Sequence, residues 1–496
     1  MDFSLHKNAL DYYRTLGVKS AVNEFTAEAV VPDTQEDIAR ILCSQCTCSV
    51  HSKDVTGGRA AVSGEAEVTV MYAPESENGA AAIGLKIPFS LAADFEGAGE
   101  PYPAADVRVT ALDVRLLNPR KVLAKCEVRA RTECWAKDEL VWYDGAEDQS
   151  GVFTRADTRT VRTAALAAEK TFVLTEELPM PPGKPVPEKL LSRGVSIRVD
   201  DTQDVGGRLI VRGTAAVGMF YLPADSVQPE YAEIETQFSQ LMELPGEPLA
   251  AFDVSSMLTD AFLEIFTDSN GVRAVSLEVH AALQAVFYRD TEMKYICDAY
   301  SPAGEVTLQR TRTEVMSSCE AETVRAVQRC QPEMPRPAKE ILAALCLPGE
   351  PAAAEGKLTA ETSVNMVCRA DDGSLFSQSV VVPAEADWAG TADAVGVRAG
   401  SAIAVPAGNC ADLRLPLDFF VRTRETGTVE YVSAMSLDDE KLYTQRRPSV
   451  TVVRAETDDL WSIAKRYRSS ERVIAGCNAL QDGDAIAGKI LLIPKY

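Results

Sequence analysis

Apolar and polar residues alternate over long stretches of the chain, which is the pattern of a β-strand with one buried and one solvent-exposed face. Residues 60–72 carry alanine, valine and tyrosine at alternate positions, with mainly serine, glutamate and threonine between them. Residues 121–134 repeat the pattern with lysine, arginine and glutamate at the polar positions, and residues 275–283 and 413–419 follow it again. The sequence therefore predicts long, half-buried strands.

The first alternating stretch returns after 149 residues. Its recurring positions are Gly58, Arg59, Val62, Gly64, Ala66, Val68 and Tyr72, which reappear as Gly207, Arg208, Val211, Gly213, Ala215, Val217 and Tyr221. A further step of 149 reaches Gly356, Lys357 and Leu358, but Thr362 and Ala370 replace the glycine and the tyrosine. Repetition over so many positions predicts tandem copies of one unit, with a degenerate third copy.

This period predicts a mainly β fold, with three tandem β-sandwich-like repeats of about 149 residues and a small C-terminal βααβ domain. The expected divisions are a helical segment at 1–20, repeats at 21–165, 166–316 and 317–440, a linker at 441–448 and a last domain at 449–496. Proline-rich residues 179–187 and 332–337 are interpreted either as stiff linkers or as the first edge of a repeat. Gly64 and Gly213, inside strands, predict a bulge or a close backbone approach.

The last 48 residues follow a different pattern, strand-helix-helix-strand. A strand with Val450 and Val452 precedes a helix whose apolar residues recur at helical spacing. Thr457 or Asp458 is expected to cap this helix, and Asp459 to lie in its first turn. The remaining predicted features are a second helix that begins at Ser469 and Ser470 with Val473, Ile474 and Cys477 inside, and a final strand at 490–494.

Several motif positions of this module agree in order and spacing with a known family. They are Asp458, Leu460, Trp461, Ile463, Ala464, Asn478, Leu480, Gly488 and residues 491–494. With them, the module resembles the LysM domain. The resemblance implies a groove for N-acetylglucosamine polymers such as peptidoglycan, between the loop before the first helix and the loop after the second.

The first loop departs from the family pattern of Gly-Asp-Thr-Leu. Thr457 adds a side chain where glycine lets a sugar ring approach the backbone, and Asp459 adds a charge. Two interpretations therefore stay open, a sugar site and a docking surface for a protein. The predicted contact residues are Thr457, Asp458, Asp459, Leu460, Asn478 and Leu480. Trp461 could stack on a sugar, but its place on the first helix favours packing.

A strand-rich repeat followed by one LysM-like module resembles the SPOCS-repeat proteins of endospore-forming Firmicutes. The resemblance implies a protein made in the mother cell, whose LysM domain binds the coat ATPase that polymerises around the forespore. We therefore expect a non-enzymatic spore coat morphogenetic scaffold at the forespore surface, whose β repeats recruit other coat proteins. The alternative is a cell-wall or cortex protein that binds peptidoglycan.

Charge and hydropathy narrow the classes of partner. The net charge is -23, with -24 on residues 1–448 and +1 on residues 449–496, so nucleic acid and anionic membranes are not expected partners. The acidic body is interpreted as a solvated surface or as a surface that attracts a basic partner. The sequence shows no apolar run long enough for membrane insertion and no signal peptide at its start, so we expect a cytoplasmic protein with twelve reduced cysteines.

Candidate chemistry is sparse. Cys43, Cys46, Cys48 and His51 could suggest zinc, but in a strand Cys46 and Cys48 face one side while Cys43 and His51 face the other. The paired glycines at 57–58 and 206–207 precede strands, so they predict turns and not phosphate cradles. No local motif of a Walker loop, a zinc protease or a serine hydrolase is present. A Ser-His-Asp or Cys-His pair stays open, but we expect no enzymatic activity, no metal and no cofactor.

Overall fold

The computed structural model describes residues 2–76, 79–96, 101–147, 151–244, 246, 248–267, 271, 273–443, 449–456, 459–481 and 483–496. Within them, twenty-two strands and two helices follow one another, and every paired strand of a sheet is antiparallel. The prediction of a mainly β fold is confirmed.

Strands β1 to β20 form three successive sets along the chain. The first set is β1 (Leu5–Val30), β2 (Ile38–Thr56), β3 (Arg59–Pro74), β4 (Ala81–Asp94), β5 (Pro101–Asn118) and β6 (Lys121–Ala146). The second is β7 (Phe153–Leu178), β8 (Pro187–Asp204), β9 (Arg208–Pro223), β10 (Glu230–Glu243), β11 (Ala251–Thr267) and β12 (Arg273–Tyr300). The third is β13 (Gly304–Cys330), β14 (Glu340–Pro348), β15 (Ala352–Ala354), β16 (Lys357–Arg369), β17 (Leu375–Asp387), β18 (Ala394–Ala399), β19 (Ile403–Ala407) and β20 (Cys410–Leu442).

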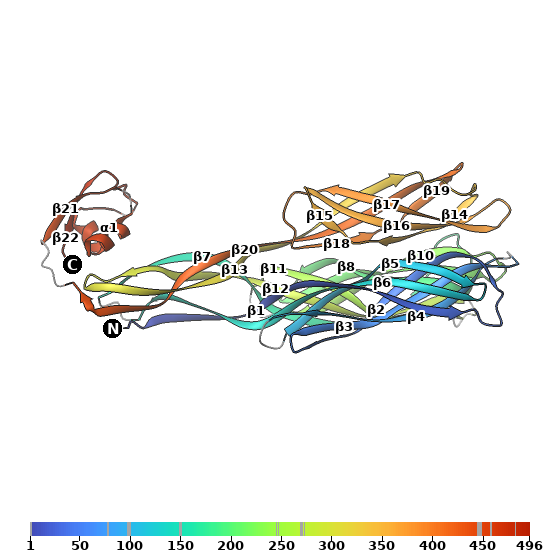
Figure 1. Ribbon diagram of the computed structural model, residues 1–496, viewed down its shortest axis with the longest axis horizontal. Helices are drawn as coiled ribbons and strands as arrows, with labels where there is room; N and C mark the ends of the chain where they lie inside the picture. Colours follow the sequence, from blue (N-terminus) through green and yellow to red (C-terminus); the bar gives the residue numbers. More distant parts are fainter. Residues whose placement is uncertain are drawn as a thin grey trace.

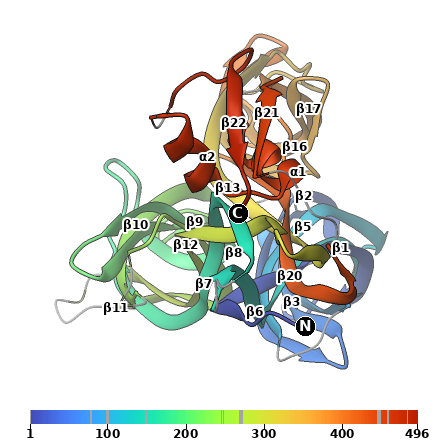
Figure 2. The same cartoon turned by 90° about the vertical axis from the view of Figure 1, so that its left-hand side faces the viewer.

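Each set contributes to two layers. Its first strand and its last strands join a ten-stranded sheet that contains β18-β20-β13-β7-β1-β6-β5 in that order, with β11, β12 and β19 attached. The middle strands form separate small sheets, β2-β3-β4, β8-β9-β10 and β14-β16-β17, the last with β15 attached. A hydrophobic core lies between the layers of each set. Figure 2 shows the three resulting lobes around a common centre.

The longest strands continue beyond the lobes. β1 pairs with β6 from Leu5 opposite Ala146 to Val30 opposite Lys121, and β7 with β12 and β13 with β20 pair over similar lengths. Their outer halves form the narrow extension in Figure 1, here called the stem. One cluster of its core contains the buried residues Leu140, Trp142, Val161, Met293, Tyr295, Val315, Val429 and Tyr431, from all three sets.

The prediction of a helix over residues 1–20 is wrong. β1 covers most of this segment and pairs with β6 almost residue by residue. Tertiary pairing outweighs the local helical preference of the segment. Met1 lies outside the described residues.

The boundaries between the three sets differ from the predicted repeat boundaries. The predicted boundaries at 165/166 and 316/317 lie inside β7 and β13. The proline-rich segments lie inside the second and third sets, where the chain passes from the ten-stranded sheet to a small sheet. They therefore do not link one set to the next.

Two strand glycines mark close contacts, as their positions predict. A Cβ on Gly64 would collide with the Ser49 carbonyl oxygen and come within 2.7 Å of the Phe89 ring. A Cβ on Gly213 would likewise meet the Arg198 carbonyl and the Phe238 ring. Each phenylalanine lies directly opposite its glycine on the neighbouring strand.

The paired glycines before β3 and β9 form turns, as predicted. Gly57 and Gly58 have φ angles of 59° and 81°, and Gly206 and Gly207 have 61° and 81°. Two consecutive positive φ angles are typical of the tight turn that joins adjacent antiparallel strands.

Candidate functional site

The C-terminal module has the predicted βααβ order. It consists of β21 (Val450–Arg454), α1 (Leu460–Tyr467), α2 (Glu471–Cys477) and β22 (Ile490–Pro494), and β21 pairs with β22. The second helix begins at Glu471, directly after the predicted start at Ser469 and Ser470, and Ser470 caps it by accepting a hydrogen bond of 3.2 Å from the Val473 amide. Asp459 occupies the N-cap position of α1 instead of its first turn, and Cys477, expected inside, is exposed.

The predicted contact residues have different environments. Thr457 and Asp458 lie outside the described residues. Leu460 and Leu480 are half-buried against the core of the module. The amide group of Asn478 donates to the carbonyl oxygens of Ile474 (2.8 Å) and Leu492 (2.7 Å) and accepts from the Leu492 amide (2.7 Å). Asn478 therefore ties α2 to β22.

Trp461 packs, as its position on the first helix favours, but its partners lie on the body. The side chain is only 6% exposed. Its indole meets the ring of Tyr300, on β12, edge-on at a centroid distance of 4.8 Å. Its Nε1 donates a 2.9 Å hydrogen bond to Asp298, also on β12. The aromatic ring that could have stacked on a sugar is thus covered by the end of the stem.

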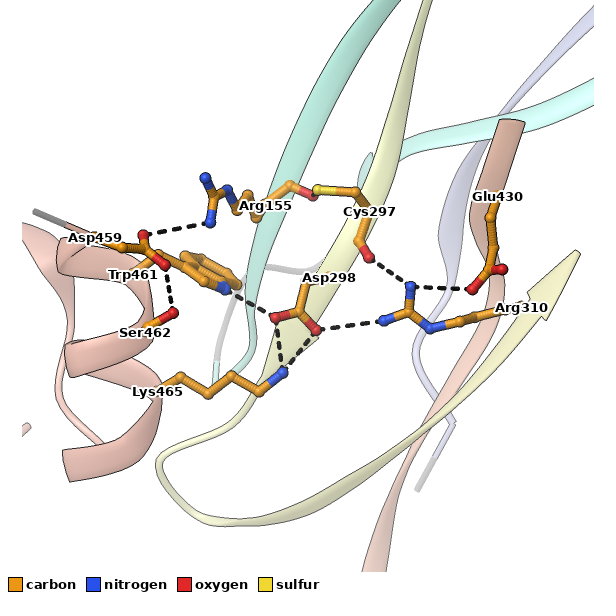
Figure 3. A network of polar contacts seen from close by, with 9 residues as sticks. All are labelled: Arg155, Cys297, Asp298, Arg310, Glu430, Asp459, Trp461, Ser462 and Lys465. Carbon is orange, nitrogen blue, oxygen red and sulfur yellow. Dashed lines mark hydrogen bonds and ion pairs between the residues drawn. The ribbon is translucent and has the colours of Figure 1, made fainter. Parts of the chain in front are cut away.

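Asp298 is the centre of a polar network between the module and the stem (Figure 3). Lys465 of α1 lies 2.7 Å from each carboxylate oxygen, and Arg310 of β13 lies 3.7 Å from one of them. Burial by itself raises the pKa of Asp298, but the hydrogen bonds from Lys465 and Trp461 outweigh it and lower the pKa below the usual aspartate value. Contact with the module therefore stabilises the carboxylate form.

Three further contacts hold the module at this place. Arg155 of β7 forms an ion pair with Asp459 at 3.3 Å. The Tyr300 hydroxyl donates a 2.8 Å hydrogen bond to the Ser469 carbonyl oxygen. The Phe153 ring lies between Tyr300 and Tyr496, at centroid distances of 5.3 Å and 5.0 Å. We call Phe153, Arg155, Asp298 and Tyr300 the docking contact of the stem.

Sequence reasoning missed the docking contact. Its residues stand at the ends of two strands from the second set, far in sequence from the module. Tyr300 gives the clearest signal, because it is an aromatic residue directly before Ser301 and Pro302, which are residue types that favour turns. A lone aromatic residue does not indicate what it will pack against.

The cysteine-rich strand is divided between two cores. Cys43 packs in a cluster shared by the three lobes, whereas Cys46 and Cys48 pack in the core of the first lobe. This matches the predicted facing of the strand. Among the described residues, no group of three or more His, Cys, Asp and Glu residues is placed to hold a metal ion. All twelve cysteines are free thiols.

No helix within the described ranges has the length and apolar character needed to cross a membrane. Residues 37–117 match the family model described as SipL, SPOCS domain. The chain contains a SipL-type SPOCS domain. The SPOCS match corresponds closely to β2 through β5, so it spans the small sheet of the first lobe and one strand of the ten-stranded sheet.

The SPOCS domain confirms the resemblance to SPOCS-repeat proteins and indicates a sporulation-related protein. The match supports the predicted resemblance to the clostridial spore coat morphogenetic protein SipL in its SPOCS part. The LysM resemblance itself stays a prediction. No curated protein and no solved structure matches the chain.

Proposed function

We propose that this protein is a non-enzymatic scaffold for spore coat assembly. In this proposal the LysM-like module docks onto a coat-assembly ATPase at the forespore surface, in the mother cell cytoplasm, and the β repeats recruit other coat proteins. The proposal rests on the match of residues 37–117 to the SipL SPOCS domain.

The contacts of Trp461, Asn478 and Asp459 favour a protein as the ligand of the module, and not a glycan. Sugar-binding sites commonly use exposed aromatic faces and free amide groups. Here the Trp461 indole is covered by Tyr300, and the Asn478 side chain hydrogen bonds within the module. Asp459, which replaces the threonine of the family loop, forms an ion pair with Arg155.

Binding of the full chain to two ligands in parallel tests the proposal. The ligands are the coat-assembly ATPase of the same organism and a soluble peptidoglycan oligomer, and calorimetric titration measures both. We expect binding to the ATPase alone. Binding to the glycan alone would overturn the proposal and favour the peptidoglycan-binding alternative.

Variants test the predicted contact face. The combined substitution Asp458→Ala and Asp459→Ala should abolish ATPase binding. Arg155→Ala removes the ion pair to Asp459 but leaves the face intact, so it should retain binding. Arg472→Ala, at an exposed position on α2, is the control within the module. Equal loss in all three variants would show that the face is wrongly assigned.

A further inference from the structure

The two-stranded sheet of the module has an apolar face exposed to solvent. Its exposed residues are Val450 (46%), Val452 (63%), Ile490 (70%) and Leu492 (42%). The alternate residues Leu491 and Ile493 are buried against the helices. An antiparallel sheet with one wet face normally carries polar residues there, so a contiguous apolar face indicates an interaction surface.

Cations flank this apolar face. Arg454 ends β21, Lys489 precedes β22 and Lys495 follows it, and all three are exposed. Neither strand contains an acidic residue. Figure 1 shows β21 and β22 at the extreme end of the molecule, beyond α1. The chemistry of the face favours a partner surface that combines apolar and acidic groups.

The body carries such a surface on the outside of the second lobe. A hollow of about 310 Å³ is lined by Phe262, Glu264, Ser276 and Glu278 on β11 and β12. Phe262 is 44% exposed. On the adjacent strand β7, Glu177 lies opposite Ser276, and exposed Val173 lies opposite His280. This outer face therefore combines the apolar side chains of Phe262 and Val173 with the acidic side chains of Glu177, Glu264 and Glu278, and His280 lies 2.6 Å from Glu278.

The two surfaces are too far apart to meet within one chain. Tyr300 holds the module at one end of β12, and Glu278 stands 22 residues earlier on the same strand. At about 3.3 Å per residue, the separation is about 70 Å.

We infer that the apolar face of β21 and β22 docks into the Phe262 hollow of a second copy of this chain. The contact joins two different surfaces, so it does not close into a dimer and each added copy offers a new free end. Successive copies of the protein then form head-to-tail chains, in which neighbouring copies are spaced on the order of 70 Å apart. This self-association is independent of what the module otherwise binds.

Sedimentation of the full chain at rising concentration tests the inference. We expect a weight-average mass that grows beyond that of a dimer, and that falls when salt screens the flanking charges. Val452→Asp should abolish the growth, whereas Val381→Asp, at a similarly exposed valine on β17, should leave it unchanged. Thermal unfolding of each variant verifies that it is folded.

A charge exchange identifies the two surfaces. Lys489→Glu with Lys495→Glu makes the flanks of the module acidic, and Glu264→Lys with Glu278→Lys makes the hollow basic. Each double variant alone should stay monomeric. An equal mixture should assemble again, because each module then meets a hollow of opposite charge.

Three results would overturn the inference. A mass that levels off at a dimer would indicate that two apolar sheet faces pair with each other. A monomer at all concentrations would show that the face has no partner in a second copy. Failure of the mixture to assemble, with both double variants folded, would exclude the hollow as the receptor.

Discussion

At the residue scale, glycine and phenylalanine form a paired feature of the small sheets. Gly64 lies opposite Phe89 and Gly213 opposite Phe238, so the ring covers bare backbone on the neighbouring strand. At the corresponding place in the third set, Thr362 lies opposite Val382. The third set thus has threonine in place of glycine and valine in place of phenylalanine. The two changes compensate each other, because a side chain that replaces glycine needs a smaller residue on the opposite strand.

Gly213→Ala should destabilise the protein by about 1–3 kcal/mol, because its Cβ has no room beside the Arg198 carbonyl and the Phe238 ring. Urea unfolding measures the change. Gly84→Ala is the control, since a Cβ there meets nothing within 4 Å. The pair Gly213→Thr and Phe238→Val should be less destabilising than the sum of its single substitutions. Additive losses would contradict the paired feature.

Glu133 occupies the centre of a buried ionic network between the three lobes. It lies 2.8 Å from Arg422 and 2.5 Å from Arg424, both on β20, while Asp253 of β11 also pairs with Arg422. Burial by itself lowers the pKa of Arg422, but the carboxylates of Glu133, Asp253 and Asp393 outweigh it and raise the pKa. The network therefore keeps the guanidinium charged at all ordinary pH values.

Glu133→Ala should cost about 3–5 kcal/mol of unfolding free energy, because it leaves two buried guanidinium groups short of a carboxylate. Chemical denaturation measures the loss. Glu139→Ala, which removes an exposed pair with Lys7, should change stability by less than about 1 kcal/mol. A similar small effect for Glu133→Ala would show that the network adds little to stability.

At the scale of elements, the module is held to the stem by a few side chains around Asp298. Asp298→Ala removes the partner of both Lys465 and the Trp461 indole. We expect α1 and α2 to exchange amide hydrogens faster, while the strands of the lobes stay protected. Glu292→Ala, at an exposed position on the same strand, is the matched control. Unchanged exchange in Asp298→Ala would show that the apolar contacts alone hold the module.

The same contact should respond to acid. The pKa of Asp298 is lower when the module is docked, so its carboxylate stabilises the docked state above the pKa of the released state. This stabilisation is lost as the pH falls through the lower, docked-state pKa, which lies below the usual aspartate value. Fluorine NMR of a fluorotryptophan-labelled chain reports the environment of Trp461. Asp298→Asn should remove this pH dependence, and its persistence would assign the change to another group.

The sequence predicted those elements whose signal is local. Alternation located β3 and β6 because one face of each strand is buried while the other meets solvent. Helical spacing located α1. By contrast, the packing of the Trp461 side chain depends on Tyr300, and the strand conformation of residues 1–20 depends on pairing with β6. The alternation of β6 does not indicate which segment pairs with it, and the aromatic side chain of Tyr300 does not indicate what packs against it. Neither contact could therefore be predicted from the sequence.

At the scale of the whole molecule, the three sets of strands share hydrophobic cores and are not independent domains in a row. The stem core combines Trp142, Tyr295 and Tyr431 from three different sets. A second shared cluster joins Leu42, Phe220 and Val367, one from the small sheet of each lobe. The period of 149 residues predicted repetition, but it could not indicate that the repeats pack around a common centre.

Because of these shared cores, we expect the lobes and the stem to unfold in one cooperative transition. Loss of one set would expose apolar surface of the other two, so partly unfolded states are disfavoured. Scanning calorimetry should therefore give one main peak whose calorimetric and van't Hoff enthalpies agree. Among the described residues, the body contributes Tyr300 and Phe153 to the core of the module, so Asp298→Ala should separate a small, early transition without splitting the main peak. Two or three separate main peaks would mean that each lobe is stable by itself, and that the stem only tethers them.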